Sequence, residues 1–215
     1  MPIFRLDIVV FPGMTVPLQV SEQRYRRLVR YATEEVGEPP RFIIAHGVKQ
    51  RGMSDGPPAF PYHGTVVNII SLEEHPDGSY ELLVHGQERC KLAITRSESI
   101  AEPNGAVRQL WFSSEKYVPI MRTDPNAEQL AAWDTLDTFK DYAGELYRGN
   151  HDAEIERFLP ADPVYQASFI CANIQAPQRS KQLLLEAPTL ARRFEMAREL
   201  MINSWPNERG PRNLA

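Results

Sequence analysis

The spacing of apolar residues changes once along this chain, and that change limits the folds open to it. Up to about residue 120, apolar residues recur at every second position, which is typical of half-buried strands. Beyond that point they recur with the spacing of an amphipathic helix. Because strands come first and helices last, the sequence predicts an α+β protein, divided into residues 1–120 and residues 121–215.

The first part predicts several strands and a single helix. Residues 3–10 alternate and end in Phe11-Pro12-Gly13-Met14, where proline followed by glycine favours a type II turn. Ser21 is expected to cap a helix that Gly37 ends. Six or seven strands with one helix favour a closed or half-closed antiparallel barrel. The further strands are expected over residues 41–46, 63–72, 79–84, 88–95 and 107–117.

The second part predicts a helical bundle. A long helix over residues 127–147 carries a broad apolar stripe, and shorter helices are expected over residues 163–174, 180–186 and 188–201. Aromatic residues on these helices are interpreted as core residues or as contacts between the barrel and the bundle. They are Trp133, Phe139, Tyr142, Phe169 and Phe194.

Composition excludes several classes of protein. The net charge is −4, and no apolar stretch approaches the roughly 20 residues that span a bilayer. Arg5 and Asp7 interrupt any signal-peptide core, so a cytoplasmic protein that does not enter membranes is expected. Cys90 and Cys171 match no ligand spacing and are interpreted as buried thiols. The five histidines form no metal-binding pattern, and no cofactor is expected.

One motif suggests catalysis, but its context opposes that reading. Ser113 and Lys116 have the S-x-x-K spacing, which places a lysine one helical turn from a nucleophilic serine. They fall in a predicted strand, however, where positions three apart point to opposite faces. The sequence therefore predicts a protein that is not an enzyme.

A cluster of arginines raises the question of nucleic-acid binding. These arginines are balanced by three nearby glutamates, and a solvated helix face explains the cluster more simply than contacts to phosphates. Nucleic acid is therefore not expected as a partner. The arginines are Arg24, Arg26, Arg27 and Arg30, and the glutamates are Glu34, Glu35 and Glu38.

Several short motifs follow one another in a distinctive order. Residues 4–20 form a strand, a Phe-Pro-Gly turn and a Pro-Leu strand, and Arg24-Tyr25 opens the next helix. In this order the chain resembles the N-terminal domain of ATP-dependent Lon proteases, from residue 4 to about residue 200. Arg5 departs from the family pattern, which has proline there. The later matching runs are Gly64 to Val67, Asp77 to Tyr80, Leu83 to Gly86, Lys181 to Glu186 and Arg193-Phe194.

The resemblance implies both a fold and a role. The fold is an antiparallel PUA-like pseudo-barrel with one early helix over residues 1–120, followed by an α-helical bundle over residues 121–215. No G-x-x-x-x-G-K-[ST] loop for ATP phosphates occurs, and 215 residues leave no room for a proteolytic domain. We therefore expect a non-catalytic module that binds unfolded or partly folded polypeptide, or a protein partner. An RNA-binding PUA-like module and an adaptor for one folded partner stay open as alternatives.

Candidate residues for peptide binding are aromatic or sulfur-containing and lie at turns or strand ends, where an exposed apolar groove is expected. Residues 52–61 hold three prolines and two glycines and are interpreted as a long loop, either functional or mobile. The peptide-binding candidates are Phe11, Met14, Phe60, Tyr62 and Trp111. The residues to which the family motif assigns a structural role are Pro12, Gly13, Arg24, Tyr25, Gly64 and Gly86.

Overall fold

The predicted change near residue 120 coincides with a change of secondary structure. The computed structural model describes residues 1–47 and 60–204, so most of the predicted loop over residues 52–61 lies outside the described residues. Strands dominate the first half and helices the second, which confirms the α+β class. The strands are β1 (Pro2–Leu6), β2 (Thr15–Val20), β3 (Arg41–His46), β4 (His63–Glu74), β5 (Tyr80–Lys91), β6 (Ile94–Ala101), β7 (Val107–Ser113) and β8 (Lys116–Tyr117). The helices are α1 (Gln23–Glu34), α2 (Pro125–Tyr147), α3 (Asp152–Phe158), α4 (Pro163–Asn173), α5 (Gln178–Glu186) and α6 (Leu190–Ser204).

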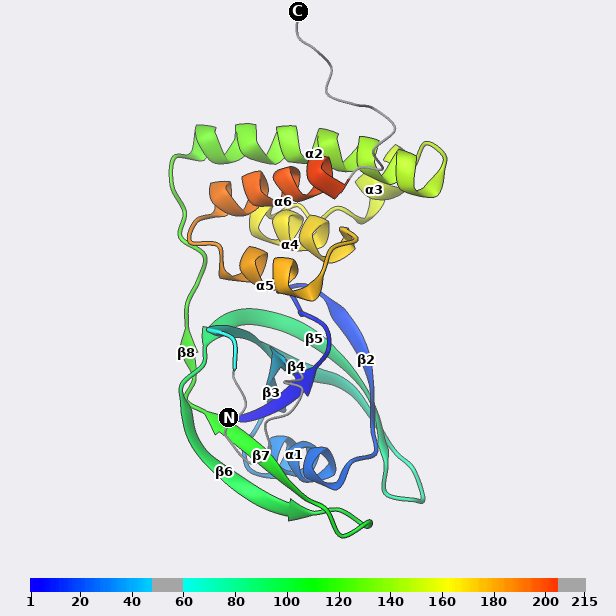
Figure 1. The fold of residues 1–215 in the computed structure, drawn as a ribbon, viewed down its shortest axis with the longest axis vertical. Helices are drawn as coiled ribbons and strands as arrows, with labels where there is room; N and C mark the ends of the chain where they lie inside the picture. The colour runs from blue at the N-terminus through cyan, green and yellow to red at the C-terminus, as the bar shows by residue number, and fades with distance from the viewer. Residues whose placement is uncertain (48–59, 205–215) are drawn as a thin grey trace, which may run out of the picture.

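The described strands form one sheet that curves around α1 (Figure 1). Its order is β2-β5-β4-β3-β1-β7-β6, and β8 pairs with β5. The named pairs are antiparallel except β1 with β3, where Ile3 lies beside Ile43 and Leu6 beside His46. This pair corrects the prediction of a wholly antiparallel barrel. The chain passes through β2 and α1 between β1 and β3, a crossover long enough to bring it back in the same direction.

The first strand is shorter than its alternation predicts. β1 ends at Leu6, and Ile8 is exposed although the pattern of residues 3–10 places it on the buried face. The backbone that follows binds outside the sheet, because the Val9 N–H donates to the Gln178 side chain over 2.8 Å. Residues after β1 therefore tie the sheet to the helices instead of extending the strand.

The predicted turn before β2 is present, and the helix after β2 begins later than predicted. Gly13 has a φ of +86°, and the Met14 N–H donates to the Phe11 carbonyl over 3.1 Å, as a type II turn requires. The N-cap of α1 is Glu22 and not Ser21; the Glu22 side chain makes no capping hydrogen bond, and Oε2 of Glu102 instead accepts from the Gln23 N–H over 3.1 Å. The cap moves because the backbone stays extended through Glu22.

The predicted strands over residues 79–84 and 88–95 belong largely to one strand. β5 continues from Tyr80 to Lys91, with irregularities in its register against β4 in place of a gap. β6 was not expected as a separate strand, because most of its residues are exposed and hydrophobic alternation gives no signal there. β7 and β8 divide the strand predicted over residues 107–117.

Helices α2 to α6 lie beyond one end of the sheet, with α5 nearest to it and α2 outermost (Figure 1). The stripe predicted on α2 is partly wrong, because Leu130 and Trp133 are about 60% exposed. The buried face carries Phe139 and Tyr142 but also Thr135, whose hydroxyl binds backbone carbonyls. The apolar stripe is wider than the surface that α2 shares with its neighbours. The short helix α3 was not predicted.

Two main apolar cores fill the two halves of the described chain. One lies inside the curved sheet against α1, and the other lies among the helices. Val9 and Phe11 come from the first half of the sequence but are buried in the helical core. The helical core therefore contains residues from both sides of residue 120, and the domain boundary predicted there stays a prediction.

Two buried arginines bind the C-terminal end of α5, one from the sheet and one from α6. Arg89 on β5 donates to the carbonyls of Leu185 and Ala187 over 2.8 and 2.7 Å. Arg193 on α6 donates to the carbonyls of Leu184 and Leu185 over 3.0 and 3.1 Å. Burial lowers the pKa of Arg193 to about 10, so it remains a cation at neutral pH. Both guanidinium groups bind the C-terminal carbonyls of α5, which have no partner within the helix.

Candidate functional site

The five candidate peptide-binding residues do not lie together. Phe11 has no exposed side-chain area and belongs to the helical core, which corrects its placement in an exposed groove. Phe60 and Trp111 are half-buried and contact each other, with ring centroids 6.1 Å apart. Tyr62 is 66% exposed, and Met14 lines a cavity between the sheet and the helices. Phe11 is buried because the turn directs its ring toward the helices.

Glycines of the family motif lie where the backbone leaves no room for a side chain. A Cβ on Gly86 would stand 2.5 Å from the Phe11 carbonyl oxygen, and one on Gly64 would stand 2.7 Å from the Ile44 carbonyl oxygen. The Gly13 N–H donates to the Gly86 carbonyl over 2.8 Å. These contacts position the turn that leads into β2.

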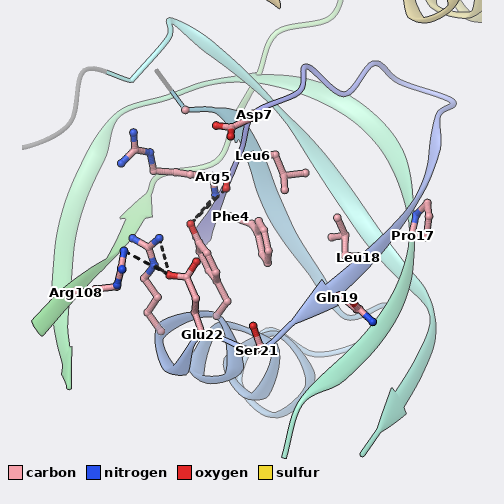
Figure 2. A pocket seen from close by; sticks show the side chains of 13 residues that line it. Phe4, Arg5, Leu6, Asp7, Pro17, Leu18, Gln19, Ser21, Glu22 and Arg108 are labelled. Carbon is pink, nitrogen blue, oxygen red and sulfur yellow. Dashed lines mark hydrogen bonds and ion pairs between the residues drawn. The ribbon is translucent and has the colours of Figure 1, made fainter. Parts of the chain in front are cut away.

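A cavity of about 590 Å³ opens between β1, β2, α1 and β7, and we name it the seam pocket (Figure 2). It lies on the open side of the curved sheet, because β2 and β6, the two ends of the strand order, are not paired with each other in the described residues. Its lining combines an apolar floor with a charged rim. The lining residues are Phe4, Arg5, Leu6, Asp7, Pro17, Leu18, Gln19, Ser21, Glu22, Arg24, Tyr25, Gly47 and Arg108.

Aromatic and aliphatic side chains form the floor of the seam pocket. The rings of Phe4 and Tyr25 stack with centroids 4.0 Å apart and planes 14° apart. Leu18 points from β2 into the space between β2 and β1 (Figure 2). Because all three side chains are buried and packed, the floor is preformed and offers apolar contact to a group that enters the pocket.

One carboxylate is held on the charged rim by two arginines. Nε and Nη2 of Arg24 lie 3.0 and 2.9 Å from Oε2 of Glu22, and Nη1 of Arg108 lies 3.8 Å from the same oxygen. The Arg24 guanidinium also lies over the Tyr25 ring, 4.4 Å from its centroid. The rim can therefore hold a carboxylate between guanidinium groups at the mouth of an apolar floor.

Tyr25 closes the edge of β1 that faces the seam pocket. Its hydroxyl accepts from the Arg5 N–H over 3.3 Å and donates to the Arg5 carbonyl over 3.4 Å. Burial raises the pKa of Tyr25, so the phenol keeps the proton that it donates. One side chain thus binds both backbone groups that a neighbouring strand would otherwise bind.

β2 leaves its outer edge open. In the described part of the chain it pairs only with β5, and the Gly86 N–H donates to the Met14 carbonyl at the start of this pairing. Bonded and non-bonded positions alternate in an antiparallel pair, so every second residue of β2 turns its backbone outward. Pro17 lacks an N–H at this edge, which limits indiscriminate strand pairing. The outward residues are Thr15, Pro17 and Gln19.

The start of β2 also lines a second cavity, of about 530 Å³, that we name the junction groove. Met14 and Thr15 form its sheet side, and residues of α3, α4 and their connection form its helical side. A smaller cavity of about 200 Å³ between α2, α3 and α4 shares Phe158, Phe169 and Asn173 with it. These three residues therefore line both cavities. The groove is lined by Pro12, Gly13, Met14, Thr15, His85, Phe158, Pro160, Tyr165, Phe169, Ala172 and Asn173.

Sequence reasoning missed the most exposed aromatic residues of the junction groove. Phe158 is 63% exposed and Tyr165 is 39% exposed. Phe158 ends α3, a helix too short to show a hydrophobic period. The signal that was available is the pair Asp162-Pro163, an N-cap followed by proline, which marks the start of α4 just before Tyr165.

Other kinds of site find no support in the described residues. No group of three or more His, Cys, Asp or Glu side chains there is placed to hold a metal ion, and no helix there is long and apolar enough to cross a membrane. Ser113 of the S-x-x-K motif is buried, and its hydroxyl binds the backbone N–H and carbonyl of Ala93. Cys90 and Cys171 are free and buried, and burial raises the pKa of each thiol to about 12.

A histidine lies at the contact between β4 and α5. The backbone N–H of His63 donates to Oε1 of Glu186 over 3.3 Å, and the His63 carbonyl accepts from Gln182 over 3.0 Å. Burial, and then the charge of Arg89, lower the pKa of the imidazole below its usual 6.5, and Glu186 opposes them. The folded protein therefore favours neutral His63.

This pKa shift predicts that acid destabilises the fold through His63. Below pH 6.5 the unfolded chain takes up a proton at this imidazole and the folded chain does not, so the free energy of unfolding falls as the pH falls through the window beneath 6.5. We expect His63→Asn to make stability less dependent on pH between 7.5 and 5, measured by urea unfolding. His75→Asn, at a half-exposed histidine on the connection from β4 to β5, is the control and should keep the wild-type slope. An unchanged slope in His63→Asn contradicts the prediction.

Comparison with known proteins identifies relatives of the chain. Residues 1–203 match the family described as the ATP-dependent protease La (LON) substrate-binding domain. Lon protease 2 of Desulfotalea psychrophila is 26% identical over 198 residues, covering 91% of this chain and 24% of the relative. The Lon protease of Porphyromonas gingivalis is 30% identical over 191 residues, covering 86% of this chain and 21% of the relative. The chain thus spans about a fifth to a quarter of these curated relatives.

Solved structures show the same fold. The N-terminal domain of the Mycobacterium avium complex Lon protease superposes with a TM-score of 0.65 at 18% identity, covering 94% of this chain and 98% of that domain. A Lon N-terminal domain protein from Xanthomonas campestris gives a TM-score of 0.56 at 22% identity, covering 95% and 97%. Since the family match spans almost every described residue and the fold agrees, this chain belongs to the family of the Lon substrate-binding domain.

Proposed function

We propose that this chain is a non-catalytic module that recognises extended, partly apolar segments of polypeptide along β2. The observation that carries the proposal is the position of β2 between two cavities. Met14 and Thr15 line the junction groove, while Pro17, Leu18 and Gln19 line the seam pocket. A segment laid along β2 would contact both cavities in succession.

The backbone of β2 matches the needs of such a segment. An unfolded polypeptide exposes N–H and carbonyl groups, and a free strand edge can bind them by adding one more strand. The outward groups of Thr15 and Gln19 supply donors and acceptors, and Pro17 supplies only a carbonyl. Backbone pairing provides affinity without requiring a particular sequence, and the cavities on either side select apolar side chains.

Family membership supports the same role. The matched family is named for substrate binding, and the match to the relatives covers only about a fifth to a quarter of their length. Since substrates of Lon proteases are polypeptides, we carry polypeptide binding over to this chain as part of the proposal. We also propose a cytoplasmic location, which the two free, buried thiols favour.

Exposed aromatic residues of the junction groove provide the test. Phe158→Ser removes an aromatic side chain that is mostly exposed, so it should leave the thermal midpoint of unfolding nearly unchanged. Its loss should weaken binding of a fluorescein-labelled, reduced and carboxymethylated model protein by about tenfold, as expected for an aromatic anchor at the centre of a binding surface. Fluorescence anisotropy measures this affinity.

Two exposed aromatic residues outside the groove serve as controls. Trp133→Ser, on α2, removes a similarly exposed ring that lines neither cavity and should bind like wild type. Tyr62→Ser, directly before β4, tests the candidate peptide-binding residue Tyr62, which does not line the groove. Equal binding by Phe158→Ser and wild type would remove the groove from the proposal, and binding only to folded proteins or to RNA would favour one of the two alternatives.

A further inference from the structure

We propose that the seam pocket binds the C-terminal carboxylate of a polypeptide segment that lies along β2, with Arg24 and Arg108 holding the carboxylate. This inference rests on the proposed function, because it names the part of the segment that the pocket takes. It follows from the way β2 ends, from the charges on the pocket rim and from the apolar floor beneath them.

The end of β2 stops an added strand. β2 finishes at Val20, and α1 begins at Gln23 after a connection of two residues, Ser21 and Glu22, both of which line the seam pocket. α1 lies across the lower side of the pocket (Figure 2). A segment that runs parallel to β2 therefore meets α1 where β2 ends, so its C-terminus would lie at the rim formed by Glu22, Arg24 and Arg108.

Charge selects which terminus is accepted there. The lining carries three guanidinium groups and two carboxylates, and the Glu102 carboxylate lies beside it, where it accepts from the Gln23 N–H over 3.1 Å. The selection therefore depends on Arg108, whose half-exposed guanidinium attracts a C-terminal carboxylate, whereas an N-terminal ammonium group would lie beside a like charge. The charged groups are Arg5, Arg24, Arg108, Asp7 and Glu22.

The rim already holds one carboxylate in the way that a ligand carboxylate would be held. Nε and Nη2 of Arg24 both contact Oε2 of Glu22, whereas Nη1 of Arg108 lies 3.8 Å from that oxygen. The side chains of Arg108 and Glu22 are 48% and 41% exposed, so Arg108 can turn toward a ligand without opening the core. Planar guanidinium groups bind carboxylates through two parallel hydrogen bonds.

The floor accommodates the last side chain of the segment. The stacked rings of Phe4 and Tyr25 and the side chain of Leu18 present an apolar surface below the charged rim. A bulky aliphatic last residue would contact the floor while its free carboxylate contacts the arginines of the rim. The predicted ligand is therefore a polypeptide C-terminus that ends in a residue such as leucine.

Matched peptides test the inference on the full chain. A short fluorescein-labelled peptide of alternating threonine and valine that ends in leucine is compared in two forms, one with a free C-terminal carboxylate and one with a C-terminal amide. We expect the free acid to bind about fivefold to tenfold more tightly, since a charge-assisted hydrogen bond is lost in the amide. A third peptide, amidated but with an internal aspartate, distinguishes a terminal carboxylate from an acidic side chain and should bind like the plain amide.

Variants assign the effect to the seam pocket. Arg108→Gln should remove most of the preference for the free acid, and Glu22→Gln should increase it, because the resident carboxylate no longer competes for Arg24. Arg30→Gln is the matched control for Arg108→Gln, since Arg30 is exposed on α1, does not line the pocket and loses the same charge. Thermal unfolding of each variant verifies that α1 is intact.

The outcomes separate this inference from the proposed function. Equal binding of acid and amide overturns the inference and leaves polypeptide binding along β2 in place. Tight binding of the aspartate peptide in amide form overturns the assignment to a C-terminus. A preference for the acid that Arg108→Gln and Arg30→Gln reduce equally shows a general charge effect and also overturns it. Absence of binding by all three peptides contradicts both proposals.

Discussion

Replacing Arg193 by alanine is expected to lower the free energy of unfolding by about 4 kcal/mol. The side chain is 1% exposed, and its guanidinium binds the carbonyls of Leu184 and Leu185 at the C-terminus of α5. Its removal takes one donor from each of these buried carbonyls, although Leu184 still accepts from the Ala187 N–H and Leu185 from Arg89, and it opens a cavity among the helices. Urea unfolding followed by circular dichroism measures the change.

Two further variants separate the effect of the lost hydrogen bonds from the effect of the lost side-chain volume. Arg192→Ala, at the neighbouring position, removes an arginine that is 44% exposed and pairs with Glu195 and Glu199, so it should cost less than about 0.5 kcal/mol. Arg193→Met keeps most of the volume and loses only the hydrogen bonds, so a cost of about 2 kcal/mol is expected. If Arg193→Met is as stable as wild type, apolar packing replaces the guanidinium and the hydrogen bonds contribute no net stability.

Gly86→Ala is expected to destabilise the fold by about 3 kcal/mol, because the new Cβ would overlap backbone atoms. It would stand 2.5 Å from the oxygen and 3.3 Å from the carbon of the Phe11 carbonyl. The chain must shift at the turn before β2, and the hydrogen bond from the Gly13 N–H to the Gly86 carbonyl weakens with it. Urea unfolding gives the stability of this variant.

Gly149→Ala is the matched control for this substitution. A Cβ there meets only the His151 side chain at 3.5 Å, which is an ordinary contact, so the change should stay within about 0.5 kcal/mol. We also expect Gly86→Ala to weaken polypeptide binding, since both cavities depend on the position of β2. Stability near that of wild type would mean that the turn moves freely, contrary to the close contact described here.

Local sequence signals predicted the elements that depend on local geometry. The Phe11 to Met14 turn follows from proline and glycine at fixed positions. The long helix α2 follows from its apolar period, although it begins at Pro125, two residues before the predicted start, after an N-cap at Asp124 whose side chain accepts from the Asn126 N–H. These features need no information about distant parts of the chain.

Features that depend on distant contacts were missed or misplaced. Trp133 fits the apolar stripe of α2 but is exposed, because no helix of the described residues covers its side of α2. Conversely, Arg89 and Arg193 are charged but buried, since they bind carbonyls that come close only in the folded chain. The candidate site depends on the same kind of information: only the sheet order shows that β2 is left unpaired at its outer edge.

The contacts of Arg89 with the end of α5 also determine how a ligand would have to adapt. Arg89 extends from β5 to the carbonyls of Leu185 and Ala187, so the sheet is tied to α5, which in turn contacts α4, a wall of the junction groove. A site of constant width loses little entropy when it binds, and nearly all the ordering cost falls on the ligand. Segments already released from their own fold would then bind more tightly than segments that must first be pulled out of one.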